Sequence, residues 1–540
     1  MECCCFHRKH VSLRGQKKTK VNNARFIIIG ITDAPNPYFP PEVLRIIRGG
    51  RVFSGGKRHH EIVRHLLPEG AEWIDITVPL DGVFEQYKQT LPPPSLSGRE
   101  QSPIKKITRG REEKESIIVF ASGDPLFFGF ANTLKREFPG ESMKLYPTFN
   151  SLQMLAHRLV MPYHDMRIVS LTGRPWPEFD RALIERAPKI GILTDKEHTP
   201  AAIAQRMLEY GYTSYTLHVG EHLGNPELER VTTLSLEEAA EREFAMPNCV
   251  IADSPPALPN REGADCPEQA SALISSKVTA PSLTGRLGSL EKPLNVASAP
   301  QREANSPFAT EGKAGVEPSF GIPDSSFALL DGREKMITKM PIRLLTLQAL
   351  DLKNRHVLWD IGACTGSVSI EARLLFPHLH IEAFEIRPEC EAIIQENMRR
   401  HGAMGIEVHI GDFLNSQFTI HNSQLTARRE ATLDTSRIHN ESPDAVFIGG
   451  HGGKLKEIMA KVLTVLAPGG VIVMNSVVAP KVTRDSHQLW DEACAELGLK
   501  QEPPLHIQLD EHHPITILRA RHEGNGEWKM DNGKLKDSSL

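Results

Sequence analysis

The chain has 540 residues, of which 40% are hydrophobic and 24% are charged, and its formal net charge is −4 at pH 7. This length is too great for a single hydrophobic core, and the slight acidity excludes binding to nucleic acid or to a membrane surface through overall charge. The chain has no apolar run long enough to cross a bilayer and no apolar signal segment near its first residue, so we predict a cytoplasmic protein without a membrane partner.

Eight cysteines are scattered along the chain without the paired spacing of zinc ligands or of a disulfide framework. This pattern predicts a reducing compartment and no bound metal. Three of the cysteines stand together at positions 3–5, beside basic residues, where a lipidation or metal patch is the alternative reading. We interpret residues 1–24 as a disordered basic tail.

The first domain is predicted at residues 25–254. It opens with an apolar strand that ends at Gly30, continues through a proline-rich loop, and enters a helix at Pro41. Further short apolar runs predict strands at 51–54, 73–78, 117–122, 144–147, 167–171, 189–194, 215–220 and 249–252. Helix-like segments such as 201–210 separate several of these strands, which indicates an α/β domain. The polar stretch 92–114 is predicted to be a surface loop.

Residues 255–318 are rich in Pro, Ser, Ala, Gly and Glu and poor in large apolar groups, so we predict a flexible linker there. The second domain is predicted at 319–523, followed by a tail at 524–540. A helix at 339–350 precedes strands at 356–361, 380–386, 406–410, 444–448, 471–475, 505–509 and 514–520, with a loop insertion at 416–442. Seven strands that end in a hairpin are typical of the Rossmann-like class I methyltransferase sheet.

A glycine-rich stretch lies at the end of the first of these strands, where residues 359–371 read Trp-Asp-Ile-Gly-Ala-Cys-Thr-Gly-Ser-Val-Ser-Ile-Glu. Gly362 and Gly366 allow the backbone to come close to a ligand, and the helix that follows presents free N–H groups. Glu385 ends the next strand, where its carboxylate can accept two ribose hydroxyl groups. This layout predicts a site for an adenosyl cofactor; a tight turn without a ligand is the alternative.

Two aspartates extend the predicted site in the second domain. Asp360 can order the turn, and Asp412, which follows Gly411, can reach the amino group of an adenine. Asp412 is equally suited to capping a helix. The sequence alone leaves both roles for Asp412 open.

Several segments of the first half resemble the tetrapyrrole methylase family, whose two α/β subdomains hold S-adenosylmethionine in the cleft between them. The loop Ser-Gly-Asp-Pro at 122–125 is the most specific, and further matches lie at 29–30, 53–59, 147–151, 171–174, 193–195 and 220–221. The resemblance implies cofactor contacts at Gly30, Gly123, Asp124, Pro125, Thr148 and Ser151. The chain reads Ile-Thr-Asp-Ala-Pro at 31–35, where many members of the family carry a Gly-Pro-Gly element.

The second half is similar to the decarboxylating C15-methylases of corrin assembly, through the segments 338–343, 359–371 and 444–453. Two positions depart from that pattern, because Cys364 stands where glycine is usual and Pro341 where glutamate is common. If the turn requires a positive φ at Cys364, its side chain costs on the order of 1 kcal/mol and lowers cofactor affinity.

Taken together, the two halves resemble the precorrin-6Y C5,15-methyltransferase (decarboxylating) family of cobalamin biosynthesis. The resemblance implies methylation of a precorrin-6B-type corrin precursor, or of its cobalt form, at C5 by the first half. It implies methylation at C15 and removal of CO₂ from the ring C acetate by the second half. Methyl transfer from a sulfonium needs alignment and exclusion of water more than a nucleophilic side chain.

A tetrapyrrole substrate carries several carboxylates, so we expect local cations at both sites. The candidates for binding substrate are Lys57, Arg58, His59, Arg174 and Lys454. In the second half Lys339 and Arg343 are further candidates, for catalysis as well as for substrate contact, and His451, which stands among four glycines, is a candidate catalytic proton donor or acceptor. A solvated basic surface is the alternative interpretation for each of these residues.

The alternative functions are RNA methylation and cofactor binding by a relic that has one non-catalytic half. RNA methylation fits poorly, because the segment 447–453 reads Phe-Ile-Gly-Gly-His-Gly-Gly and not the Asn/Asp-Pro-Pro-aromatic element of many base methyltransferases. A bifunctional relic with one non-catalytic cofactor-binding half is favoured only by Cys364. We expect the protein to form a homo-oligomer, by resemblance to relatives of each half.

Overall fold

The computed structural model describes residues 24–91, 116–254, 320–331, 333, 336–416, 442–477, 486–508, 514–522, 528–531 and 534–537. The predicted basic tail, the linker and the two polar insertions lie outside these ranges, apart from single residues at their edges. None of the helices in the described ranges combines the length and the apolar character that a membrane crossing requires.

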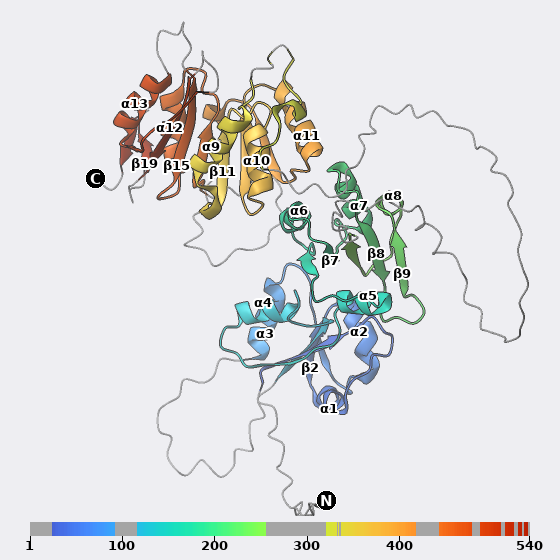
Figure 1. Cartoon of the computed structure of the whole chain (residues 1–540). Coiled ribbons are helices and arrows are strands. Elements are labelled where there is room, and N and C mark those ends of the chain that lie inside the picture. Colours follow the sequence, from blue (N-terminus) through green and yellow to red (C-terminus); the bar gives the residue numbers. More distant parts are fainter. Residues whose placement is uncertain are drawn as a thin grey trace, which may run out of the picture. The chain divides into compact units, whose positions relative to one another are not determined.

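The first half begins with a parallel five-stranded sheet in the order β3-β2-β4-β1-β5. Its strand β2 and the surrounding helices α1 to α4 are drawn in blue to cyan in Figure 1. Its strands are β1 (Phe26–Ile31), β2 (Val52–Gly55), β3 (Glu72–Asp75), β4 (Ile117–Ser122) and β5 (Met143–Tyr146). Its helices are α1 (Pro41–Gly49), α2 (Lys57–Val63), α3 (Asp81–Thr90) and α4 (Phe130–Glu137). Every residue of β1 is buried, as an unbroken apolar run in a central parallel strand predicts. The loops after β1, β2 and β4 leave the sheet at one common edge.

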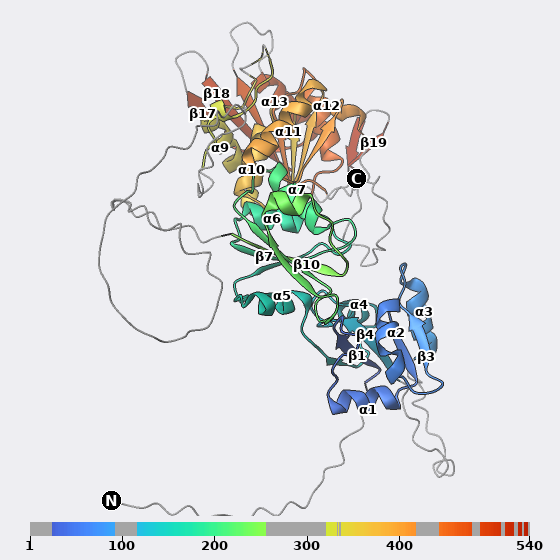
Figure 2. The same cartoon turned by 90° about the vertical axis from the view of Figure 1, so that its right-hand side faces the viewer.

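A second, mixed sheet of the first half has the order β6-β7-β10-β8-β9, in which only β6 and β7 pair in parallel. Its strands are β6 (Arg167–Ser170), β7 (Lys189–Leu193), β8 (Thr216–Glu221), β9 (Arg230–Leu234) and β10 (Asn248–Asp253). Its helices are α5 (Ser151–Leu159), α6 (Pro177–Ile184), α7 (Pro200–Glu209) and α8 (Leu236–Ala240). Cys249 and Ile251 of β10 pack with α5, and Val250 packs with α6 to α8 on the other face (Figure 2). The edge strand β9 was not predicted.

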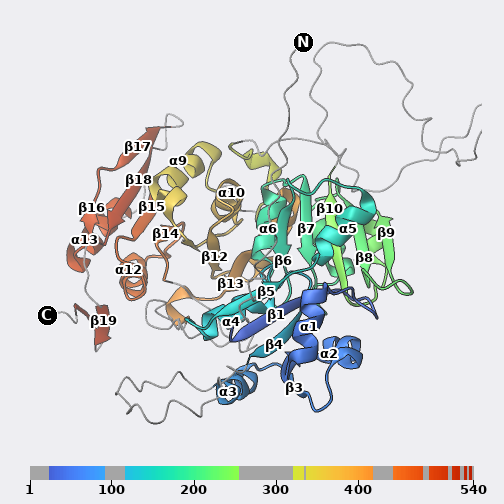
Figure 3. The ribbon, with the colours of Figure 1, turned by 90° about the horizontal axis from the view of Figure 1, so that it is seen from below.

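The second half contains the predicted sheet, in the order β13-β12-β11-β14-β15-β18-β16, with β17 also paired to β18 (Figure 3). Its strands are β11 (Val357–Ile361), β12 (His380–Glu385), β13 (Ile406–Ile410), β14 (Ala445–Ile448), β15 (Val471–Val477), β16 (Lys500–Gln501), β17 (Leu505–Gln508) and β18 (Pro514–Arg521). Strands β11 to β15 are parallel, and β18 runs antiparallel to β15. The two-residue strand β16 was not predicted. A further hairpin, β19 (Trp528–Asp531) with β20 (Lys534–Asp537), lies in the stretch predicted to be a tail.

Two layers of helices cover the sheet of the second half. They are α9 (Met340–Leu350), α10 (Ser367–Leu375), α11 (Glu389–His401), α12 (Leu455–Leu463) and α13 (Ser486–Leu497). Leu358 and Phe447 pack with α9, α10 and α11, whereas the adjacent Trp359 and Val446 pack with α12 and α13. This alternation follows from the two-residue period of a strand. The chain leaves β11 toward β12 on one side and β14 lies on the other, so a crevice is expected at the carboxyl ends of these strands.

The tightest backbone contact in the first half joins β1 to the turn after β4. A methyl group at Gly30 would lie 2.0 Å from the carbonyl oxygen of Gly123 and 2.9 Å from the amide nitrogen of Thr148. Both neighbours are backbone atoms, so neither can move without shifting a strand or a turn.

We therefore expect Gly30→Ala to lower the free energy of unfolding of the first half by about 3 kcal/mol, through overpacking. The matched control is Gly49→Ala at the end of α1, where a methyl group would meet no atom within 4 Å. That control should unfold like the parent chain or slightly later. Chemical denaturation followed by circular dichroism measures both variants, and equal stability of the two would contradict the close contact.

Candidate active sites

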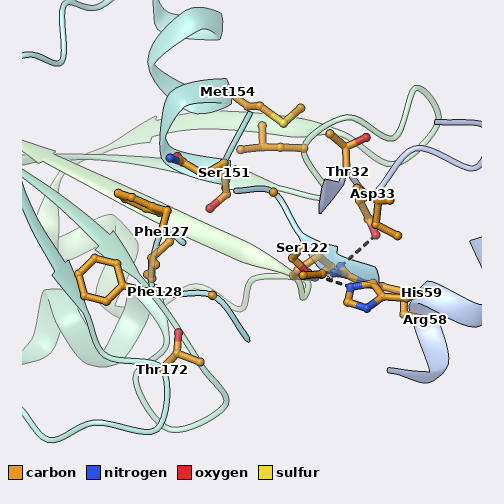
Figure 4. Close-up of a pocket in the computed structure, with 18 of the residues that line it drawn as sticks. Thr32, Asp33, Arg58, His59, Ser122, Phe127, Phe128, Ser151, Met154 and Thr172 are labelled. Carbon is orange, nitrogen blue, oxygen red and sulfur yellow. Dashed lines mark hydrogen bonds and ion pairs between the residues drawn. The ribbon is translucent and has the colours of Figure 1, made fainter. Parts of the chain in front are cut away.

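A cavity of about 500 Å³ lies in the first half, where the loops after β1, β2 and β4 meet α5 and the loops of the second sheet. Its aromatic wall contains Phe127, Phe128 and Phe149. Figure 4 shows Asp33, Arg58, His59 and Ser122 gathered at one end of this pocket, away from Phe127 and Phe128. The residues predicted from sequence that line the cavity are Arg58, His59, Gly123 and Ser151.

The predicted Ser-Gly-Asp-Pro loop forms a tight turn at the wall of the cavity. Gly123 has φ of +60°, which favours glycine, and the Thr148 amide donates to its carbonyl at 3.4 Å. The carboxylate of Asp124 accepts the amide of Leu126 at 2.9 Å, which closes the turn from within. Of the predicted cofactor-contacting residues, those outside the cavity lining are Gly30, Asp124, Pro125 and Thr148. Asp124 and Pro125 belong to this turn, and Gly30 and Thr148 lie against it.

The basic end of the cavity is a hydrogen-bonded network. Arg58 donates from Nη1 to Asp33 Oδ1 at 3.0 Å and from Nη2 to Ser122 Oγ at 2.9 Å. His59 Nε2 lies 3.0 Å from the same Ser122 oxygen. Burial, reinforced by the positive charge of Arg58, lowers the pKa of His59 to about 4, so this imidazole is neutral at pH 7.

Asp33 also reaches the second sheet. Its Oδ2 lies 2.9 Å from Nδ1 of His222, a residue that directly follows β8 and has φ of +47°. Asp33 thus connects Arg58 with the loop after β8. Asp33, Ser122 and His222 were not predicted as site residues, although Ser122 ends a parallel strand immediately before the Gly123 turn.

The two remaining predicted cations of the first half stand outside the cavity lining. Lys57 is exposed at the first residue of α2. Arg174 is also exposed, and its guanidinium carbon lies 5.0 Å from the ring centre of Phe128, which does line the cavity. Phe128 itself has φ of +52° and is 46% exposed. Arg174 therefore stands beside the aromatic wall, whereas nothing in the described residues brings Lys57 to it.

In the second half, both glycines of the glycine-rich turn have the positive φ angles that favour glycine. Gly362 and Gly366 have φ of +81° and +72°, and Cys364 between them has φ of +52°. A methyl group at Gly362 would lie 2.6 Å from the amide nitrogen of Gly450, so this turn packs directly on the turn after β14. The condition stated for Cys364 is met, because a non-glycine residue occupies the left-handed region here.

Glu385 points at this turn, but its carboxylate is already engaged. Its oxygens accept the Cys364 amide at 2.8 Å and, from Arg387, the backbone amide at 3.0 Å and the guanidinium Nε and Nη2 at 2.8 and 3.0 Å. Burial alone would raise the pKa of Glu385, but these hydrogen bonds hold it below its ordinary value. Ribose hydroxyls can reach the carboxylate only if the side chain of Arg387 withdraws.

Asp360 is buried at the start of the same turn. Ser369 donates to its Oδ2 at 2.6 Å, whereas Oδ1 has no hydrogen-bond partner among the described residues. Burial raises the pKa of Asp360 to about 6. An unpartnered buried carboxylate oxygen is suited to accept an ammonium group, which the methionine part of S-adenosylmethionine carries. The carboxylate that this turn presents therefore fits the ammonium group of the cofactor.

Asp412 takes the capping role that the sequence left open. Its Oδ1 accepts the Leu414 amide at 3.0 Å, and its Oδ2 lies 3.4 Å from Nζ of Lys454. Lys461, which the sequence analysis did not single out, donates to the carbonyls of Phe413 and Leu414 at 2.7 and 2.8 Å. The loop after β13 is thus held by two lysines, Lys454 just before α12 and Lys461 within it. The side chain of Lys454 remains exposed beside this loop.

Arg343 was predicted to contact substrate, and the structure contradicts this. Its side chain is fully buried and donates to Glu371 Oε2 at 2.9 Å, to Asp324 Oδ1 at 3.1 Å and to the Thr338 carbonyl at 2.8 Å, as well as to the Ile322 carbonyl. A guanidinium enclosed in this way fastens the segment before α9 to α10. Arg343 is therefore a structural residue.

The other two predicted catalytic residues of the second half remain accessible. Lys339 directly precedes α9 without a side-chain capping bond, is half exposed, and its Nζ lies 3.8 Å from Asp324 Oδ2. His451 is partly buried after β14, and burial lowers its pKa. The Gly453 amide donates to His451 Nδ1 at 3.2 Å, so the hydrogen of the neutral ring is assigned to Nε2.

The left-handed conformation of Cys364 gives a stability test. Cys364→Gly should unfold at higher denaturant than Cys364→Ala by about 1 kcal/mol, because both variants lack the thiol but only alanine keeps the strained Cβ. The alanine variant is thus the matched control, and denaturant unfolding of the full chain is the measurement. Equal stability would show that the turn tolerates a side chain at this position. We also expect Cys364→Gly to bind S-adenosylmethionine more tightly than the parent.

The engaged carboxylate of Glu385 gives a binding test. Arg387→Met should tighten S-adenosylmethionine binding at the second half about tenfold, because the ribose no longer competes with a two-point ion pair. Calorimetry in a Gly123→Val background isolates the second site, and Arg400→Met, which removes an exposed pair with Glu396, is the matched control. Weaker binding in Arg387→Met would mean that Arg387 holds the cofactor instead of excluding it.

Comparison with known proteins follows the division into halves. The model of Tetrapyrrole (Corrin/Porphyrin) Methylases matches residues 25–240, and that of a precorrin methyltransferase domain matches 331–501. A precorrin-6Y C(5,15)-methyltransferase (decarboxylating) of Sinorhizobium sp is 27% identical over 472 residues, which cover 87% of this chain and 88% of that protein.

Relatives that match a shorter stretch of the chain have higher sequence identity. A cobalt-precorrin-6B C(15)-methyltransferase (decarboxylating) of Salmonella typhimurium is 34% identical over 203 residues, 36% of this chain and 94% of the relative. A crystal structure of precorrin-6y C5,15-methyltransferase from Geobacter metallireducens is 31% identical, covers 37% of this chain and 96% of its own, and has a TM-score of 0.29. The chain therefore belongs to the family of decarboxylating precorrin methyltransferases, with a tetrapyrrole methylase domain as its first half.

Proposed function

We propose that this enzyme methylates a precorrin-6B-type corrin precursor at C5 in its first half and at C15 in its second half, where it also removes CO₂ from the ring C acetate. The observation that carries the proposal is the presence of two separate left-handed glycine turns, at Gly123 and at Gly362 to Gly366, each at the carboxyl edge of its own parallel sheet. Two such turns in one chain support two methyl transfers.

S-adenosylmethionine is the methyl donor, and it supplies a methyl group on a sulfonium that is displaced in line by an electron pair of the ring carbon. The chain's own residues bind and orient the acceptor. In the first half, the aromatic wall of Phe127, Phe128 and Phe149 offers apolar contact to a flat ring. Arg58 and Arg174 offer hydrogen-bond donors to its carboxylates. The turn at Gly123 and the N-terminus of α5 at Ser151 form the adjoining wall for the cofactor.

In the second half the unpartnered Asp360 oxygen and the carboxylate of Glu385 would hold the cofactor, and the turn after β14 stands against them. Loss of CO₂ breaks a carbon–carbon bond, leaves its electron pair in the conjugated ring and requires one proton at the remaining carbon. His451 belongs to the turn that touches Gly362 and is neutral at pH 7, with its hydrogen on Nε2. Through this atom it can donate a hydrogen bond to the ring, while Lys339 and Lys454 remain available to carboxylates.

Incubation of the full chain with precorrin-6B or its cobalt form and methyl-labelled S-adenosylmethionine tests the proposal. Mass spectrometry should show two labelled methyl groups gained and one CO₂ lost. Gly362→Val, whose side chain would collide with the backbone of Gly450, should abolish CO₂ loss. Gly123→Val, which would collide with Asn150, should leave the product without the C5 methyl group.

Circular dichroism of both variants checks that each remains folded. A parent chain that binds S-adenosylmethionine in both halves but transfers a single methyl group would contradict the proposal and support a half that has lost catalysis. Transfer of the labelled methyl group to RNA, and not to the corrin, would replace the proposed function with RNA methylation.

A further inference from the structure

The hydroxyl group of Ser122 occupies an unusual position at the basic end of the cavity. Ser122 is the last residue of β4, is exposed, and lines the cavity together with Arg58 and His59. Its oxygen is approached by two side chains at once, Arg58 Nη2 at 2.9 Å and His59 Nε2 at 3.0 Å. The direction of its own hydrogen atom therefore depends on which of these neighbours are donors.

Arginine carries only donors, so Ser122 accepts from Arg58. For His59 the direction follows from its other nitrogen, because the Gly56 amide points at Nδ1 at 3.4 Å and a backbone N–H can only donate. Nδ1 is therefore assigned as the acceptor of the ring and its single hydrogen is placed on Nε2, which is directed at Ser122, with the Phe120 backbone as a second hydrogen-bond partner of the ring. Both lone pairs of the Ser122 oxygen are thus occupied, and its hydrogen is left to point into the cavity.

The guanidinium group of Arg58, beside the Ser122 hydroxyl, is held in place by further contacts. Asp33 accepts from Arg58 Nη1 at 3.0 Å and is itself bound by His222 at 2.9 Å, so the plane of the guanidinium is fixed by two loops. Two of the five N–H groups of Arg58 are engaged by described residues, and its side chain is 40% exposed. The same end of the cavity therefore presents an O–H donor and further N–H donors side by side (Figure 4).

We propose that Ser122 and Arg58 together bind one peripheral carboxylate of the corrin substrate in the first half, with His59 as the positioning residue that keeps the Ser122 hydroxyl turned toward it. The inference rests on the proposed function and names a substrate contact within it. A carboxylate suits the pair because it accepts from both donors and offers no hydrogen to the occupied Ser122 oxygen. The methionine carboxylate of the cofactor has the same chemistry, so the test must separate the two sources.

Ser122→Ala and Ser122→Thr, made in the full chain, provide the test. Loss of one charge-assisted hydrogen bond should raise the dissociation constant of the corrin substrate about tenfold in Ser122→Ala, while Ser122→Thr, which keeps the hydroxyl, should stay within about twofold of the parent. Absorbance titration with precorrin-6B or its cobalt form, in the presence of S-adenosylhomocysteine, measures this affinity. Calorimetry with S-adenosylmethionine in a Gly362→Val background should give the same cofactor affinity for all three chains.

The positioning role of His59 is tested by a double-variant cycle. His59→Leu should weaken substrate binding several-fold in the parent chain and add nothing in the Ser122→Ala chain, because the histidine acts only through that hydroxyl. An additive effect would overturn the role of His59. Weakened cofactor binding with unchanged substrate binding in Ser122→Ala would assign the hydroxyl to the cofactor and overturn the inference, as would no change in either. Methyl transfer by the parent chain, scored separately by mass spectrometry, shows whether the proposed function itself fails.

Discussion

Direct contact of backbone with backbone, at the carboxyl edge of a parallel sheet, is the constraint on which both sites depend. In the first half Gly30 lies against the carbonyl of Gly123, and in the second half Gly362 lies against the amide of Gly450. No side chain fits between these segments, so each turn is fixed by the strands it joins and not by its own sequence. Their neighbours in the chain, Ser122 before Gly123 and His451 after Gly450, take their positions from these contacts.

Burial decides which charged groups near these turns are free for a ligand. Arg343 and Arg387 both belong to the second half, and both are paired with a glutamate. Arg343 is enclosed and its pair with Glu371 is buried on both sides, so parting them would leave an unpaired charge in the core. The side chain of Arg387 is 22% exposed, so its charge can move into water when Glu385 takes another partner. The Arg343–Glu371 pair is therefore structural, whereas the Arg387–Glu385 pair can open to admit another partner of Glu385.

The sequence predicted the strands well where an apolar run was continuous. The span of β4 agrees with the structure residue for residue, because it is a buried apolar run that ends at the exposed Ser122. The sequence also predicted the span of β13, although only Ile406 of that edge strand is buried. It failed for β9 and β16, whose edge positions leave their residues half or fully exposed and so erase the apolar pattern. Site residues followed the same division. Gly123 and Glu385 could be proposed from the sequence because their spacing belongs to a turn, whereas Asp33 and His222 meet only when two sheets come together.

The basic end of the first cavity also explains how an acidic chain can bind an acidic ring. Arg58 is neutralised by Asp33 and His59 is uncharged, so this end carries little net charge. What it offers a carboxylate is a set of donors that are already oriented, with their acceptor partners bound behind them. In a confined site, oriented donors need no reorganisation when the anion enters, and the neutralised pair does not repel the remaining charges of the protein. Specificity for the position of a carboxylate on the ring then follows from the direction of hydrogen bonds and not from the total charge of the chain.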